Sequence, residues 1–315
     1  MSEGAASAAS LLPADFKDAD VFVDMLAEVY GVDAVPAILA TLAESRTLSY
    51  WVNPMVPGDF SPAGEPLDGM PGVYVLPRGG GFTTSPAANE GKVYIQNPSS
   101  ILAVRVLEPQ PGEEVLDLAA APGGKTIAMA KAMDNRGRIA AVEPVRGRFH
   151  RLRANLQRCG VEIAELYLRD GRGVGRAVPN RFDRVLLDAP CSSQARMRWN
   201  EPATYTHWTR RKVKEAGRKQ KSLLQSAYAA LKPGGRMLYC TCSFAPEENE
   251  VAVASLLKRS DAELVEIAGV LPCMTRPGLT VWRGRALDDR LALSVRIVPD
   301  EVWDGFYLAA ITRPA

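Results

Sequence analysis

The chain has 315 residues, of which 47% are hydrophobic and 23% charged, and its formal net charge is +2. This composition excludes an intrinsically disordered chain, and the length accommodates one large α/β domain with a smaller module. The sequence has no apolar run of membrane-spanning length and no secretory signal in residues 1–14, so we expect a cytoplasmic protein, which we expect to be a monomer.

The first 95 residues predict a small α+β module behind a short tail. Residues 1–14 are small and polar, and we expect them to be disordered. Apolar positions at helical spacing predict helices at 16–30 and 36–44. Runs with β-like character occur at 48–52, 73–76 and 93–95. We therefore expect residues 15–95 to form one module.

After Pro111 the pattern changes to strands that alternate with helices. Such alternation is how a parallel sheet with crossover helices appears in a sequence. We expect seven strands, at 115–118, 138–142, 165–168, 184–187, 237–241, 264–267 and 306–312. Seven strands with helices between them predict a doubly wound, Rossmann-like α/β sheet, and we assign residues 96–315 to one domain.

A glycine-rich turn follows the first of these strands and opens a helix. Glycine lets a backbone approach a ligand closely, and a helix N-terminus presents unpaired N–H groups. The segment ends like a phosphate-binding P-loop, but such a loop needs glycine at the position of Ala119. Glu143 stands near the offset at which an acid binds ribose hydroxyls, so a nucleoside cofactor fits better than a nucleoside triphosphate.

Polar and reactive side chains follow several of the predicted strands. Those at or just past a C-terminal strand end are Asp117, Glu143, Asp170, Asp188 and Cys242. Open α/β sheets bind ligands at this edge, so we expect the five side chains to line one crevice. Asp170 is a candidate partner for an adenine amino group, although its neighbouring glycines equally fit an ordinary turn.

Two cysteines follow neighbouring strands of the predicted sheet, Cys191 in Asp-Ala-Pro-Cys and Cys242 in Thr-Cys-Ser. The five cysteines are unevenly spaced and form no disulfide framework, and neither histidine has metal-ligand spacing, so no metal site is expected. Methylation of cytosine at carbon 5 needs a thiolate that adds to carbon 6, an acid near N3 and a base that removes the C5 proton. Asp188 and the two cysteines can fill these three roles.

Two basic stretches offer a path for a phosphate backbone. Residues 196–221 include nine Lys or Arg against Glu201 and Glu215, and residues 146–158 include five arginines and no acid. Phosphate contacts supply most of the sequence-independent affinity for nucleic acid. A charge run is as often a solvated helix face, so both interpretations stay open.

Taken together, the motifs resemble those of the Nop/Sun family of RNA cytosine-5 methyltransferases. The likeness runs over about residues 96–309, and it rests on 96–100, on the turn at 117–126, on both cysteine motifs, on Glu247-Glu248-Asn249-Glu250 and on 304–309. The family usually has glycine where this chain has Ser193. By this resemblance Cys242 is the nucleophile and Cys191 the cysteine that releases the product.

The resemblance also implies S-adenosylmethionine as cofactor and RNA as partner, with ribosomal RNA preferred over transfer RNA. The target cytosine is expected to be single-stranded or flipped out, and residues 15–95 to contact RNA. The residues expected to bind the cofactor are Ala119, Ala120, Ala121, Pro122, Gly123, Gly124, Lys125, Glu143, Asp170 and Asp188.

Two other functions fit parts of the pattern. A P-loop-like NTPase would explain the glycine-rich turn, but Ala119, Pro122 and the paired cysteines count against it. A catalytically inactive RNA-binding assembly factor on the same fold would need neither cysteine, and both Cys191 and Cys242 are intact.

Overall fold

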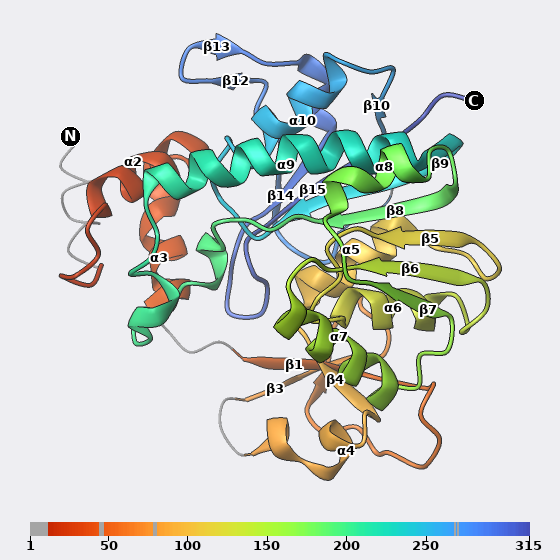
Figure 1. Cartoon of the computed structure of the whole chain (residues 1–315). Helices are drawn as coiled ribbons and strands as arrows, with labels where there is room; N and C mark the ends of the chain where they lie inside the picture. Colours follow the sequence, from red (N-terminus) through yellow and green to blue (C-terminus); the bar gives the residue numbers. More distant parts are fainter. Residues whose placement is uncertain (1–11, 44–46, 78–80, 268, 270) are drawn as a thin grey trace.

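A nine-stranded sheet forms the centre of the computed structural model, which describes residues 12–43, 47–77, 81–267, 269 and 271–315 (Figure 1). Its order is β11-β14-β15-β9-β8-β5-β6-β7, and β10 pairs with β15. Neighbours among β5 to β9 are parallel, whereas β15 is antiparallel to β9. The bounds are β5 Glu114–Asp117, β6 Arg138–Val142, β7 Ala164–Tyr167, β8 Phe182–Asp188, β9 Leu231–Thr241, β10 Glu263–Leu264, β11 Thr275–Pro277, β14 Val295–Ile297 and β15 Phe306–Thr312.

The predicted Rossmann-like sheet is confirmed, but one of its strands is misplaced. The strand expected at 264–267 is wrong in extent, because β10 covers only Glu263–Leu264. β10 pairs with the C-terminal end of β15, and the N-terminal half of β15 pairs with β14, an antiparallel strand that was not expected. The central residue of β14 is Arg296, a buried arginine that forms an ion pair with Glu250. Val295 and Ile297 are apolar, but a strand of three residues with a charged centre is shorter than the runs on which the expected strands rest.

Helices cover both faces of the sheet, and the side chains of each strand alternate between two hydrophobic cores. Leu186 of β8 packs in the core under α5, α6 and α7, whereas Leu187 packs in the core under α8, α9 and α10. The bounds are α5 Pro98–Leu107, α6 Gly124–Ala132, α7 Arg146–Arg158, α8 Val174–Ala177, α9 Arg210–Ala230 and α10 Glu250–Leu257.

The N-terminal segment contributes two helices and a separate sheet. The helices expected at 16–30 and 36–44 are present as α2 Ala19–Tyr30 and α3 Val35–Ala43, and the three β-like runs form strands with the expected bounds. The sheet is antiparallel, in the order β2-β3-β1-β4. The remaining bounds are β1 Leu48–Val52, β2 Glu65–Pro66, β3 Val73–Leu76, α4 Pro86–Asn89, β4 Val93–Ile95, β12 Val281–Trp282 and β13 Arg285–Ala286.

The two parts of this segment contact different regions of the molecule. Figure 1 shows α2 and α3 beside the N-terminal end of α9, and β1, β3 and β4 on the side of α6 and α7. Phe22 and Tyr30 of α2 pack against Phe244, whereas Asn53, just after β1, donates to the carbonyl of Cys159. The division at residue 95 stays a prediction, and the expected disordered tail lies mostly outside the described residues, which begin at Leu12.

In the part of the chain that the structure describes, no single helix has both the length and the apolar character to cross a membrane. The stretches Ala19–Tyr30 and Val32–Ala43 meet these criteria only as a pair, and they are bent by 117° relative to one another.

Candidate active site

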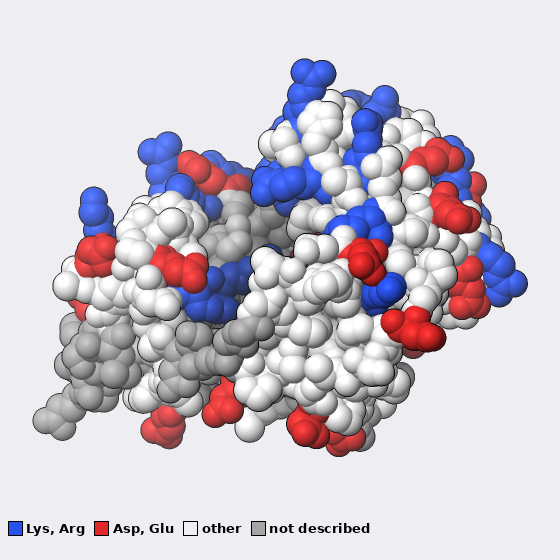
Figure 2. Space-filling view, turned by 90° about the horizontal axis from the view of Figure 1, so that it is seen from below, with Lys and Arg blue, Asp and Glu red and all other residues white. Residues whose placement is uncertain are grey.

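A cleft of about 630 Å³ opens at the C-terminal ends of the parallel strands. The five side chains predicted to meet at this edge all line it, and so does Cys191. The volume is in the usual range for small-molecule sites. Figure 2 shows Lys and Arg side chains around a hollow on the face seen from below. The topological rule therefore predicted correctly that these side chains line one cleft.

The glycine-rich turn links β5 to α6 and forms one wall of the cleft. Ala119, Ala120, Ala121, Pro122, Gly124 and Lys125 line the cleft, but Gly123 does not. Gly123 has a φ of 114°, and a Cβ there would lie 3.1 Å from Leu152 Cδ1. Position 123 therefore requires glycine, because of its backbone conformation and its packing against α7. A direct contact between Gly123 and the cofactor stays a prediction.

Asp117 ends β5 with one carboxylate oxygen paired and the other free. Its Oδ2 accepts a hydrogen bond of 2.6 Å from Thr126, and burial raises the pKa of the carboxyl to about 6. Its Oδ1 is buried and has no hydrogen-bond partner among the described residues. A buried acceptor without a partner is costly unless a ligand supplies a donor, so this wall fits a ligand that carries N–H or O–H groups.

Glu143 and Asp170 lie farther along the same edge. Glu143 is buried, and its carboxylate accepts a hydrogen bond of 2.9 Å from the backbone of Val145. Asp170 is bound by Arg172, with 2.6 Å between the charged groups, and this guanidinium lowers the pKa of Asp170. Any contact of Asp170 with an adenine must therefore compete with Arg172.

The two cysteine thiols face each other across the cleft floor. Strands β8 and β9 pair in parallel with Asp188 opposite Cys240, so the residues just beyond the two strand ends meet. The sulfur atoms of Cys191 and Cys242 are 3.3 Å apart. A hydrogen bond from Cys191 lowers the pKa of Cys242, burial opposes this, and the positive charge of Arg196 lowers that pKa further. The pKa of the Cys242 thiol is therefore below its ordinary value.

Lys125 contacts Asp188 rather than the cofactor side of the turn. The ammonium lies 2.6 Å from Asp188 Oδ2 and 3.3 Å from the Ser100 hydroxyl. Burial is the largest single effect and lowers the pKa of Lys125, but the charges of Asp188 and Cys240 together with the hydrogen bond to Asp188 outweigh it, and the pKa is raised. The buried pair places an acid and a cation beside the thiols, and it leaves Lys125 in a position unlike that of a P-loop lysine, which reaches phosphates.

Sequence reasoning missed two features of this site. Arg196, counted only as part of a basic stretch, lines the cleft and acts electrostatically on Cys242. Ser193, where the family usually has glycine, has a left-handed backbone with φ of 57°. Non-glycine residues pay about 1 kcal/mol for that conformation, and the departure from the family pattern was the signal that could have indicated it.

The Rossmann-like sheet with a cleft at its C-terminal edge is the fold of the class I methyltransferases, as its structural neighbours show. The model is similar to the crystal structure of a methyltransferase homolog protein from Pyrococcus horikoshii, with a TM-score of 0.80 and 28% identity over 99% of this chain and 100% of that one. The chain belongs to the family described as 16S rRNA methyltransferase RsmB/F, whose model matches residues 104–312. The resemblance inferred from the motifs is thereby confirmed.

The relatives of the chain act on more than one RNA. A tRNA (cytosine(49)-C(5))-methyltransferase of Pyrococcus abyssi is 44% identical over 225 residues, which are 71% of each chain. Ribosomal RNA small subunit methyltransferase F of Vibrio campbellii is 44% identical over 56% of this chain but only 37% of its own length. These are S-adenosylmethionine-dependent RNA cytosine-5 methyltransferases, and the NTPase and assembly-factor hypotheses find no support.

Proposed function

We propose that this protein transfers a methyl group from S-adenosylmethionine to carbon 5 of a cytosine in RNA through a covalent adduct with Cys242. The observation that carries the proposal is the 3.3 Å contact between two thiols inside the ligand cleft. One buried cysteine alone would be ordinary packing. Two thiols beside the Lys125–Asp188 pair supply a nucleophile, a second sulfur and a proton-handling group in one place.

In this mechanism Cys242 adds to carbon 6, and the new S–C bond pushes electron density toward carbon 5 and N3. Asp188, held by Lys125, is the acid near N3 and meets the negative charge that develops there. The cofactor, when bound, supplies the electrophilic methyl group. The thiol proton of Cys191 passes to solvent before the Cys191 sulfur accepts the proton from carbon 5. The electron pair of the C5–H bond then re-forms the 5,6 double bond as the S–C bond breaks, and Cys242 leaves as a thiolate.

Ribosomal RNA is the preferred substrate in this proposal, because the matching family model is described by that substrate. Transfer RNA is the second candidate, since the relative that matches the larger share of its own length is a tRNA enzyme. Bisulfite sequencing of total RNA from cells with and without the protein tests both. We expect one protected cytosine in ribosomal RNA to disappear without the protein; loss of a protected position in tRNA would favour the second candidate, and no change at any position would contradict the activity.

Other parts of the proposal rest on the sequence expectations. We assign RNA contacts to residues 15–95 and catalysis to residues 96–315, and we expect a cytoplasmic monomer. All five cysteines are free thiols, which agrees with a reducing compartment.

For the cofactor, we propose that its carboxylate binds at the turn 123–126 and its ribose at Glu143. The start of α6 offers N–H groups that lack acceptors within the helix, and Glu143 and the free Asp117 oxygen are acceptors in the same cleft. The residues present therefore fit a ligand with one anionic group and several donors.

Replacing Glu143 with alanine should weaken S-adenosylmethionine binding by about 10- to 100-fold, the usual loss for hydrogen bonds to a charged group. Isothermal titration calorimetry measures this, with thermal unfolding to show that the fold is retained. Glu162→Ala, which removes an exposed acid, is the matched control. Unchanged affinity, or tighter binding of ATP than of S-adenosylmethionine, would contradict the assignment.

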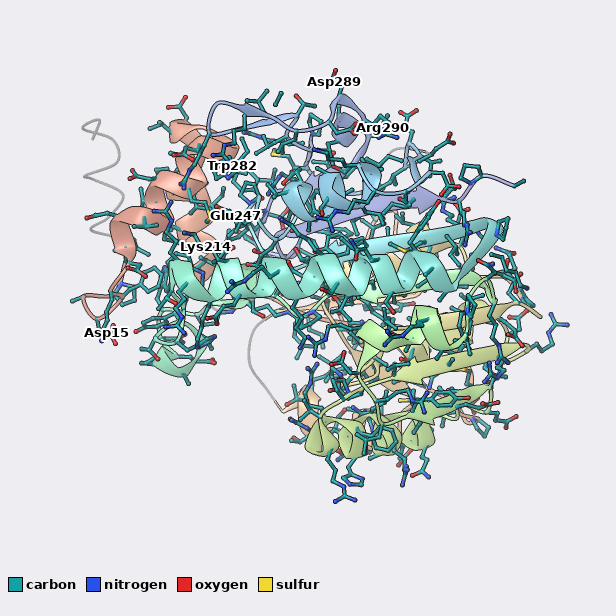
Figure 3. The ribbon with its side chains drawn as sticks, turned by 45° about the horizontal axis from the view of Figure 1, so that its top comes forward. Asp15, Lys214, Glu247, Trp282, Asp289 and Arg290 are labelled. Carbon is teal, nitrogen blue, oxygen red and sulfur yellow. The ribbon has the colours of Figure 1, made fainter. Side chains whose placement is uncertain are left out.

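The basic stretch on α9 divides between two flanks of the helix. Lys219 lines the catalytic cleft with Leu223. Arg210, Lys214 and Lys221 line a separate groove with Glu247, which precedes α10. At 3.6 residues per turn, these three lie on the side of α9 opposite to Lys219, and Figure 3 shows Lys214 and Glu247 on the outer face of α9 and α10. We propose that phosphates nearest the target cytosine contact Lys219, and that more distant ones contact the groove.

The charge reversal Lys219→Glu should weaken RNA binding and reduce the slope of log affinity against log salt by about 1 for each phosphate that is no longer neutralised. The double change Arg211→Glu with Lys214→Glu should do the same in the outer groove. Fluorescence anisotropy with total RNA over a salt series measures both, and Lys258→Glu, at the exposed end of α10, is the control. If neither variant changed affinity or salt dependence, the stretch would be a solvated helix face.

A further inference from the structure

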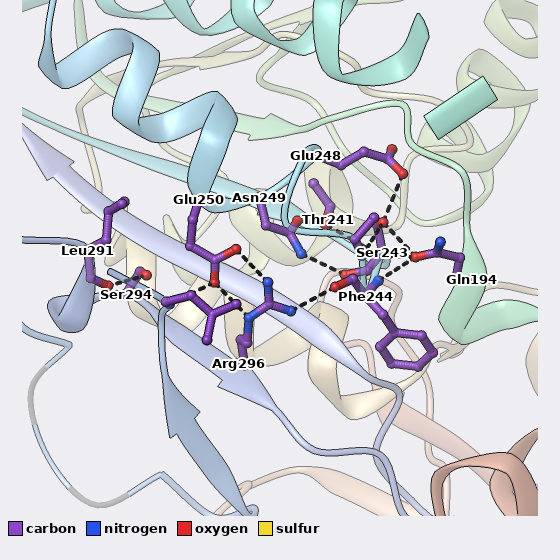
Figure 4. Close-up of polar contacts among 12 residues, drawn as sticks. Gln194, Thr241, Ser243, Phe244, Glu248, Asn249, Glu250, Leu291, Ser294 and Arg296 are labelled. Carbon is purple, nitrogen blue, oxygen red and sulfur yellow. Dashed lines mark hydrogen bonds and ion pairs between the residues drawn. The ribbon is translucent and has the colours of Figure 1, made fainter. Parts of the chain in front are cut away.

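Two consecutive buried residues, Glu248 and Asn249, contact the loops that carry the two cysteines, and Figure 4 shows their contacts with Ser243 beside Cys242. They lie between β9 and α10, within the segment Glu247-Glu248-Asn249-Glu250 that the mechanism above leaves without a role. Both side chains have no exposed surface, so burying them must be offset by the hydrogen bonds they make.

Glu248 holds the chain on both sides of Cys191. Its carboxylate accepts a hydrogen bond of 2.9 Å from the backbone N–H of Ser192, and a second from the Ser192 hydroxyl. Gln220 of α9 donates both to this carboxylate and to the carbonyl of Pro190, each at 3.0 Å. The residue before Cys191 and the residue after it are therefore fixed by one connected group.

Asn249 does the same for Cys242. It accepts a hydrogen bond of 2.5 Å from the Thr241 hydroxyl and donates one of 2.8 Å to the Ser243 carbonyl. The Ser243 hydroxyl in turn donates to Glu248, at 2.9 Å, and so joins the two groups. The separation of the two sulfur atoms is thus set by side chains of adjacent residues.

The charges around the two thiols have opposite effects on the pKa values of Cys191 and Cys242. Cys191 has a raised pKa, caused by its hydrogen bond to Cys242, by burial and by the negative charges of Cys242 and Glu248. The positive charge of Arg196 acts on Cys242 in the other direction, while Asp188 opposes it. Glu248 therefore favours the proton on Cys191, and Arg196 favours the charge on Cys242.

We propose that Glu248 is a positioning residue that gives the two thiols separate roles: it holds Cys191 against Cys242 and keeps their shared proton on Cys191. The inference rests on the proposed covalent mechanism and goes beyond it, because nothing in the chemistry of two identical side chains decides which one attacks. The charge of this carboxylate acts in the same direction as its hold on the loop, adding to the larger effects of Cys242 and of burial that raise the pKa of Cys191.

Glu248→Gln tests the proposal, because it keeps the shape of the side chain but removes the charge and turns an acceptor toward Ser192 into a donor. We expect Cys191 to be misplaced and release of the product to slow by about 100-fold, as an error of ~1 Å can cause. A protein–RNA adduct that carries the transferred methyl group should then accumulate on denaturing electrophoresis with total RNA. In free protein, the ratio of Cys191 to Cys242 alkylated by iodoacetamide should rise.

Two further variants separate geometry from charge. Gln220→Met removes the hydrogen bonds to Pro190 and to the Glu248 carboxylate but keeps the carboxylate itself, so it should accumulate adduct and change the alkylation ratio less than Glu248→Gln does. Glu266→Gln removes a charge from an exposed residue that lines neither the cleft nor the outer groove, and it should release RNA like the unmodified protein. If thermal unfolding shows that Glu248→Gln does not fold, Gln220→Met tests the positioning role instead. Accumulation of adduct by Gln220→Met supports that role, and normal release contradicts it.

The outcomes distinguish this inference from the proposed function. If Cys191→Ala traps RNA but Glu248→Gln and Gln220→Met turn over normally, without adduct and with an unchanged alkylation ratio, Glu248 is a structural residue only and the inference is wrong. If Cys191→Ala also fails to trap RNA, the covalent mechanism itself is wrong.

Discussion

Cys242→Ala should bind RNA and cofactor normally but lose methyl transfer by at least about 10⁴-fold, the scale of loss when a covalent nucleophile is removed. Without the thiolate, carbon 5 of cytosine is too weak a nucleophile for the methyl donor. The measurement is transfer of a radiolabelled methyl group from S-adenosylmethionine to total RNA from cells that lack the protein.

The matched control for this variant is Cys273→Ala, which removes a half-buried thiol from outside the catalytic cleft and should leave transfer unchanged. Thermal unfolding separates a chemical loss from a folding defect. Methyl transfer by Cys242→Ala within tenfold of the unmodified rate would contradict the role of Cys242.

Cys191→Ala should fail at a later step and in a visible way. Cys242 can still attack and the methyl group can still be transferred, but removal of the C5 proton is impaired, so the thiol cannot leave. Multiple turnover should fall by about 10²- to 10⁴-fold, the usual contribution of a general acid or base, while a stable adduct accumulates. Denaturing electrophoresis should show a protein band of lower mobility that contains RNA and the labelled methyl group.

The opposite pattern would reverse the two roles. If Cys242→Ala trapped RNA and Cys191→Ala did not, the cysteine after proline would be the nucleophile, as in the DNA cytosine-5 methyltransferases. Normal methylation by both variants would rule out covalent catalysis.

The sequence predicted the sheet well where strands are apolar runs. The strands β6 and β15 have the bounds expected, because their residues are buried and continuous in hydrophobic character. It failed at β14, where Arg296 is buried only because Glu250 neutralises it from a segment far along the chain. The apolar neighbours Val295 and Ile297 form too short a run to predict a strand, and the sequence does not show that Arg296 is compensated at long range.

The candidate site was predicted through a topological rule rather than through contacts. Because the ends of parallel strands meet at one edge, Asp188 and Cys242 could be placed in one crevice without coordinates. The pairing of Lys125 with Asp188 and the hold of Glu248 on Ser192 could not, since each joins side chains more than 50 residues apart. Gly123 was expected at the cofactor. The structure gives this glycine a further role that the motif does not indicate, in its backbone conformation and its packing against Leu152.

The formation of an adduct through Cys242 is tested most directly by comparing Cys191→Ala with the double variant Cys191→Ala, Cys242→Ala. Both are incubated with total RNA and methyl-labelled S-adenosylmethionine, treated with ribonuclease and separated under denaturing conditions. We predict label on the protein band of the single variant and none on that of the double variant, because trapping requires the Cys242 thiolate. Label on both bands, or on neither, would contradict a covalent intermediate at Cys242.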